Sequence, residues 1–175
     1  MAKTRLTKIE VAESHLKWAV KLFFLRSDPI VIETLVGAAS GVLRGIAHAR
    51  GVQPFVHDSD WIKPEYKGLW IKTLHKAQNF SKHADKDPDG VLEYETEMLH
   101  FMLLEACHLY RHLSSDMYLG YHQCKEALVY ELWFAAAYPH LIKVPEELKT
   151  FMGSFDFADI DPDDFDAVVS VLNRS

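Results

Sequence analysis

Apolar residues recur every three or four positions along most of this chain, and this spacing is the feature that most restricts its fold. Residues at such steps share one face of an α-helix. Thr7 and Glu10 precede the first run with the spacing of a capping box. We therefore expect a helix over about residues 7–26, with a buried face of Ile9, Ala12, Leu16, Ala19, Val20 and Phe23.

A second helix has clear boundaries in the sequence. Asp28 is a suitable N-cap, Pro29 suits the first helical position, and Gly51 follows Ala49, the last expected helical residue. The connection to the first helix is only a few residues long, so the two helices are predicted to form an antiparallel hairpin.

Glycines recur every four residues within this second helix, at Gly37, Gly41 and Gly45. Glycine is costly inside a helix, and this spacing favours the close approach of another backbone along one face. Arg44 and His48 project near the same face by helical geometry. Both are therefore candidate ligand-binding residues.

The remaining periodic segments predict three more main helices and short C-terminal helices. A helix beginning at Pro64 has an expected core face of Tyr66, Leu69, Trp70, Leu74, Ala77 and Phe80, and the loop 85–90 ends it. Further helices are expected over about Glu95–Leu113 and Lys125–Ala137, then from Pro145 and from Asp161-Pro162. The fold class is all-α: a single-domain bundle of five main helices over residues 1–152, and an acidic segment, 153–175, with a short docked helix.

Composition narrows the class of protein further. The 175 residues are 49% hydrophobic, enough for one core, and the two cysteines lack a CxxC spacing. With no signal peptide, and with the longest apolar runs broken by Lys21 and Arg26, we expect a cytoplasmic protein with unpaired, buried thiols and no membrane anchor. A nucleophile elbow, a phosphate-binding glycine loop and a zinc-knuckle spacing are all missing, so no cofactor is predicted.

Charge is distributed unevenly along the chain. The net charge of −6 is concentrated in the C-terminal tail, where six of the 25 acids are Asp156, Asp159, Asp161, Asp163, Asp164 and Asp166. Upstream lies a basic strip made of Lys63, Lys67, Lys72, Lys76, Lys82 and Lys86. This strip is compatible with an anionic partner.

The strongest candidate site lies where the third helix ends. Asn79 and His83 are one turn apart, with Lys82 and Asp85 beside them. A histidine polarised by a carboxylate could act as a general base, with Lys82 steering phosphate. The alternative is architectural, because Asn, His and Asp at a helix end also bond free carbonyls and loop amides.

Two Glu-x-x-His steps on the fourth helix suggest a second candidate. Glu97, His100, Glu105 and His108 resemble part of a helical di-metal site, although such sites draw their ligands from several helices. The alternative is that this side of the helix is an exposed polar face or a partly apolar self-association surface.

Several of these segments also resemble known helical proteins. The stretch Gln78–Pro88, the break at Ser27–Pro29 and the approach 58–66 resemble an uncharacterised bacterial and phage family of small helical proteins with an Asn-Phe-x-Lys-His-Ala-Asp-x-Asp-Pro signature. Asn79 and His83 are also similar to the Arg-Asn-x-x-x-His motif of HEPN domains, with Gln78 in place of the arginine. HEPN domains include toxin ribonucleases and non-catalytic binding modules, usually dimeric.

Three functions follow as hypotheses. The first is a HEPN-like binding or regulatory module, a homodimer with an RNA or protein partner, in a bacterial stress, defence or mobile-element setting. The second is a metal-independent endoribonuclease in which His83 is the acid/base, Asn79 orients it, and Lys82 or Arg44 holds phosphate. The third is a metal-binding protein that uses the Glu97 to His108 face.

Overall fold

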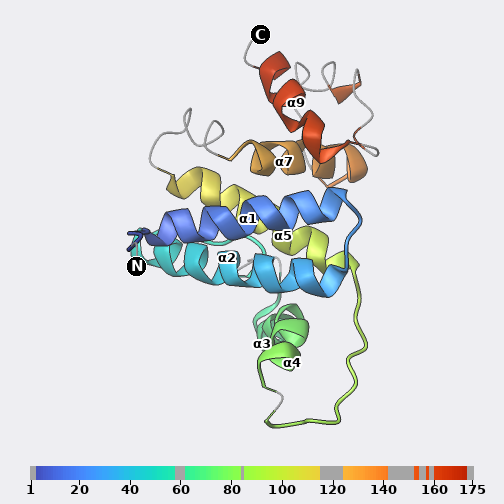
Figure 1. Cartoon of the computed structure of the whole chain (residues 1–175). Coiled ribbons are helices and arrows are strands. Elements are labelled where there is room, and N and C mark those ends of the chain that lie inside the picture. The colour runs from blue at the N-terminus through green and yellow to red at the C-terminus, as the bar shows by residue number, and fades with distance from the viewer. Residues whose placement is uncertain are drawn as a thin grey trace.

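The computed structural model describes residues 3–57, 62–83, 85–114, 124–141, 152–153, 157 and 160–172. Within these ranges the protein is all-α and contains no strand. Four helices form the bundle seen in Figure 1: α1 (Lys8–Phe24), α2 (Pro29–Ala49), α5 (Glu97–Leu113) and α7 (Lys125–Ala137).

Capping residues set the start of the first two helices as the sequence predicts. The Thr7 hydroxyl accepts from the Glu10 amide at 3.2 Å, and the Glu10 carboxylate accepts from the Thr7 amide at 2.7 Å. The Asp28 carboxylate accepts from the Ile30 amide at 2.9 Å, with Pro29 at the first helical position. Gly51, with φ 71°, follows the end of α2, and α1 and α2 pack as the expected hairpin.

The core lies between α1, α2, α5 and α7, and its aromatic residues keep their polar atoms bonded. The hydroxyl of Tyr110 donates to Glu13 at 2.8 Å, and that of Tyr130 donates to the His100 carbonyl at 3.0 Å. Cys107 and Cys124 are unpaired and buried, as expected. Fully buried side chains include Leu16, Leu43, Leu103, Tyr110, Tyr130 and Phe134.

Helix α2 is long and apolar enough to cross a membrane, judged by its length and composition alone. Core helices of bundles pass the same test, and Val36, Ala39 and Leu43 are fully buried here against the rest of the bundle.

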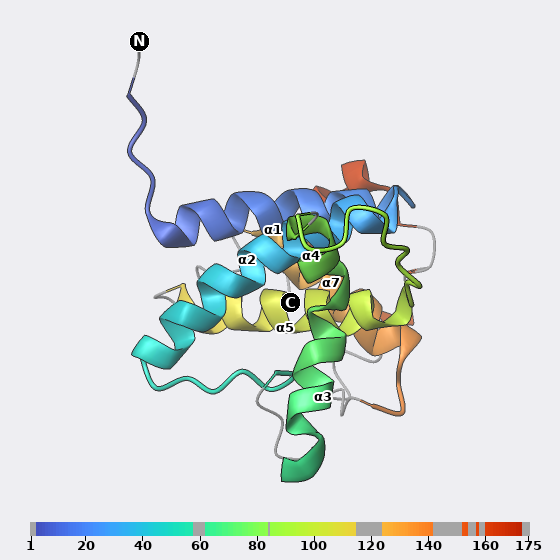
Figure 2. The same cartoon turned by 90° about the horizontal axis from the view of Figure 1, so that it is seen from below.

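The predicted third helix is divided in two. It consists of α3 (Pro64–Leu74) and α4 (Lys76–Lys82), with His75 between them. These two helices lie below α2 in Figure 1, and α3 extends past the bundle in Figure 2. We call them the α3–α4 arm. Tyr66 and Leu69 are 57% and 65% exposed, so their assignment to the core is wrong.

The break arises because the two halves of the arm are held by different partners. The Trp70 indole donates to the Val56 carbonyl at 2.8 Å, which fixes α3 to the connection after α2. Ala77 is buried and α4 packs against α2. Apolar periodicity alone reveals neither of these attachments.

The C-terminal helix begins as predicted. The Asp161 carboxylate accepts from the Asp163 amide at 2.9 Å, and Pro162 opens the 3₁₀ turn η2 (Pro162–Asp164), which continues into α9 (Phe165–Leu172). Phe165 and Val168 are buried, and α9 packs on α7, on the side of the bundle away from the arm (Figure 1). The short helix expected from Pro145 lies outside the described residues.

Candidate binding site beside α4

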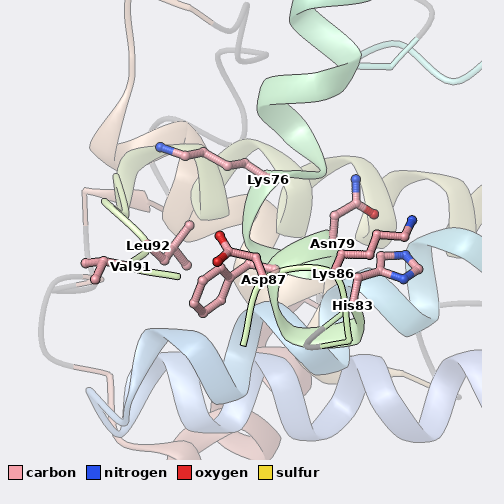
Figure 3. A pocket seen from close by; sticks show the side chains of 8 residues that line it. Lys76, Asn79, His83, Lys86, Asp87, Val91 and Leu92 are labelled. Atoms are coloured by element: carbon pink, nitrogen blue, oxygen red, sulfur yellow. The ribbon is translucent and has the colours of Figure 1, made fainter. Parts of the chain in front are cut away.

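A pocket of about 420 Å³ opens beside α4 and the loop that follows it. Asn79, His83 and Lys86 gather at one end of it, while Val91 and Leu92 lie at the other (Figure 3). The remaining lining residues are Lys76, Phe80 and Asp87. The pocket therefore offers polar and cationic groups at one end and apolar groups at the other.

Helical spacing and three loop contacts build this pocket. Residues 76, 79, 80 and 83 fall on one face of α4. The Lys76 ammonium donates to the Glu93 carbonyl at 2.9 Å. This bond holds the segment that carries Val91 and Leu92 next to α4. The Tyr94 hydroxyl donates to Glu33 on α2 at 3.1 Å. A Cβ at position 90 would collide with the Asp87 carboxylate, so Gly90 is what allows Asp87 to lie here.

Asn79 and His83 are exposed, and within the described ranges their side chains form no hydrogen bond or ion pair. Backbone groups end the helix instead: the His83 amide donates to the Asn79 carbonyl at 3.1 Å, and the Lys86 amide donates to the His83 carbonyl at 2.9 Å. The architectural interpretation assigned these side chains to carbonyls and loop amides. The described part of the structure contains no such contact.

The other candidates do not line the pocket. Lys82 and Asp85 are exposed near it, whereas Arg44 and His48 lie on α2. Sequence reasoning missed Lys86 and Asp87 as lining residues. Both are in the predicted loop, and helical periodicity carries no information about where a loop side chain points.

Gln78 lies against α2, whereas Asn79 is exposed. A Cβ at Gly37 would lie 2.5 Å from the Gln78 side-chain nitrogen, so this glycine admits Gln78 to the surface of α2. The predicted close approach of another backbone is not found at Gly37, where the neighbour is this side chain. At Gly41 and Gly45 a Cβ would meet nothing within 4 Å, so close packing is wrong there.

Glu105 is fully buried, which corrects its assignment to an exposed face of α5. Its carboxylate accepts from the Val56 amide at 2.7 Å, from the His57 amide at 2.9 Å, and from Nδ1 of His57. Burial would raise the pKa of Glu105, but the contacts with His57 and Val56 outweigh it and hold the pKa below its usual value. The connection after α2 is thus fastened to the core by one carboxylate.

His57 and His75 form a buried contact next to this carboxylate. Their ring centroids are 5.2 Å apart. Nε2 of His57 and Nδ1 of His75 are buried and have no hydrogen-bond partner among the described residues. Burial, together with the positive charges of Arg44, His57 and Lys82, lowers the pKa of His75, while the Gln78 side chain opposes the shift. No sequence spacing links these residues.

Three of the four residues of the proposed metal face engage separate partners. His100 contacts the Tyr138 hydroxyl at 2.7 Å, His108 lies 3.7 Å from Glu131, and Glu97 is exposed. Burial lowers the pKa of His100. Across the ranges that the structure covers, no group of three or more His, Cys, Asp or Glu side chains could hold a metal ion. Leu104, which was assigned to the same face, is also buried.

Fold and site together define a helical bundle that carries a basic helical arm with an open amphipathic pocket. Comparisons with models of protein families, with curated proteins and with solved structures gave no match.

Proposed function

We propose that this protein is a HEPN-like binding module and that the pocket beside α4 holds a phosphate-bearing ligand, single-stranded RNA. The observation that carries this proposal is the exposure of Asn79 and His83 in a pocket shared with Lys86, their side chains unbonded within the described ranges. Polar groups left available in this way can bond a ligand without first breaking an internal contact.

The chemistry of the pocket suits a nucleotide. Lys86 can pair with a phosphate, and Asn79 can donate to a phosphate or bond a base edge. Phe80 is 41% exposed and offers a face on which a base can stack. The Asp87 carboxylate repels phosphate but accepts from ribose hydroxyls or base amino groups. Lysines 63, 67, 72 and 82 surround the arm with positive charge along a longer strand.

Binding is tested by fluorescence anisotropy with a labelled ten-nucleotide single-stranded RNA. Replacing Lys86 by Gln removes one phosphate contact, so we expect the affinity for RNA to fall by about fivefold or more at low salt. The slope of log affinity against log salt concentration should become smaller by about one. Asn79→Ala should also weaken binding. The charge-matched control is Lys8→Gln, on the exposed start of α1.

If Lys86→Gln and Lys8→Gln lower affinity equally, the pocket is not the binding site and the interaction is only general electrostatic attraction. If the wild-type protein shows no binding at micromolar concentration in low salt, the proposal fails. Competition by a single-stranded DNA of the same sequence measures whether the 2′-hydroxyl contributes.

A metal-independent endoribonuclease is the second candidate. The observation that favours it is that Lys86 places a cation in the same pocket as His83, while Gln78, which replaces the motif arginine, points toward α2. His83 would serve as acid/base and Asn79 would orient it or the substrate. Cleavage of RNA in chelator by the wild type, lost in His83→Ala, would support this function. Equal cleavage by both proteins would reject it.

We also propose that the protein is a cytoplasmic bacterial homodimer in a stress, defence or mobile-element setting. Tyr66 and Leu69 support a dimer because they are exposed neighbours on α3, a helix with one buried residue, Leu74. Light scattering should give about twice the chain mass of 20.1 kDa. Leu69→Glu should halve that mass, and a monomeric wild type would reject the dimer.

A further inference from the structure

The arm changes direction at a single residue. His75 ends α3, where its amide donates to the Ile71 carbonyl at 3.1 Å, and its own carbonyl accepts from the Asn79 amide at 2.8 Å as the first bond of α4. The His75 residue is partly buried. Its ring lies against the ring of His57, with Nδ1 buried and without a partner among the described residues. The residue at which the arm bends is therefore also one of its contacts with the rest of the protein.

Cations approach this ring from several elements. Arg44 comes from α2, His57 from the connection after α2, and Lys82 from α4. Among the described residues, the acid bonded to His57 is Glu105 of α5. Gln78 is the uncharged neighbour, and its hydrogen bond favours the protonated ring. A proton on His75 would thus be added among like charges, and Gln78 only partly offsets this cost.

The attachment of α4 depends on the same place. Gln78 contacts the His75 ring, lies against Gly37 of α2, and is adjacent in sequence to Asn79. A displacement of the His75 ring therefore loosens the contact that fixes the α4 face carrying Asn79 and His83.

We propose that His75 is a pH-operated latch: while neutral it holds the α3–α4 arm against α2 and His57, and when protonated it releases α4 and thereby reshapes the pocket. The latch concerns the attachment of the arm and does not depend on what the pocket binds. It requires no added component other than the proton.

The direction of the effect follows from the lowered pKa of His75. A released ring has the ordinary pKa of about 6.5, so the open arm binds the proton first as pH falls. The latch is therefore fully effective above about pH 6.5, the pKa of the released ring. It weakens as the pH falls from there toward the lower pKa that His75 has in the closed arm. At pH 5.5 a ring protonated only in the open state favours opening by up to about tenfold relative to pH 7.5.

Backbone amide NMR tests the latch, with hydrogen exchange corrected for the intrinsic effect of pH. In the wild type we expect residues 76–82 to shift together below about pH 6.5 and to exchange up to about tenfold faster at pH 5.5, while α1 and α5 keep their protection. His75→Gln cannot gain a proton and should lose this response. His75→Lys carries a permanent charge and should show the open α4 already at pH 7.5.

His140→Gln is the control, because His140 is an exposed histidine on the connection after α7. It should retain the wild-type response. The latch is rejected if His75→Gln responds to pH as the wild type does, or if α4 in the wild type shows no transition between pH 7.5 and 5.5. The absence of a transition in the wild type rejects the latch even if a His75 variant does not fold. RNA affinity is measured separately, so a pocket that binds no RNA leaves this test unaffected.

Discussion

Glu105 and Glu97 offer a direct test of the energetics, because they occupy equivalent positions in the two Glu-x-x-His steps of one helix but only Glu105 is buried. Glu105→Ala leaves the Val56 amide, the His57 amide and the His57 ring without their acceptor. Each buried unsatisfied donor costs about 1–3 kcal/mol, and breaking a buried pair from one side costs about 3–5 kcal/mol. These costs overlap, so we expect a loss of about 4 kcal/mol.

A graded series separates the contributions. Glu105→Gln keeps an acceptor for the two amides but loses the charge opposite His57, so the expected loss is about 2 kcal/mol. Glu97→Ala changes an exposed side chain and should cost less than about 1 kcal/mol. Urea unfolding followed by far-UV circular dichroism gives the free energies of unfolding. They can be compared provided that the variants have the same dependence of free energy on urea concentration. If the free energies of unfolding of Glu105→Ala and Glu97→Ala differ by less than about 1 kcal/mol, the Glu105 carboxylate does not hold the connection after α2 to the core.

The same series has a pH dependence of known sign. The pKa of Glu105 is below its usual value, so the stabilisation it provides is present above about pH 4.5 and is lost as pH falls through the folded-state pKa. The difference in stability between wild type and Glu105→Ala should therefore shrink below about pH 4.5. A difference that grows on acidification would contradict the assignment.

The remaining predictions concern helix α2 and the start of α1. Gly41→Ala meets open space and should raise the free energy of unfolding by about 0.5–1 kcal/mol, measured by urea unfolding. Gly37→Ala is the matched change that displaces Gln78, so it should not raise the free energy of unfolding and should speed hydrogen exchange in α4. An equal rise in the free energy of unfolding at both sites would contradict the Gln78 contact. Thr7→Ala removes the cap of α1 and should lower the thermal midpoint through a loss of about 1 kcal/mol, whereas an unchanged midpoint would show that the cap does not contribute.

The pocket residues Asn79 and His83 were identifiable from sequence because they fall one turn apart on a helix, and helical spacing carries over to three dimensions. Their partner Lys86 was not, since it follows the helix end and its direction depends on loop contacts such as that between Lys76 and Glu93. The burial of Glu105 was likewise hidden, because its partner His57 is 48 residues away and lies in a connection without periodicity.

The sequence by itself determined the helices of the bundle, from Thr7 and Asp28 as caps to the C-terminal turn at Asp161, because capping and apolar spacing are local properties of the chain. Only the tertiary structure decided that the third helix breaks at His75. That outcome depends on attachments to α2 and to the connection after it, which lie far away in sequence. The same attachments turn Gln78 inward and leave Asn79 and His83 facing solvent.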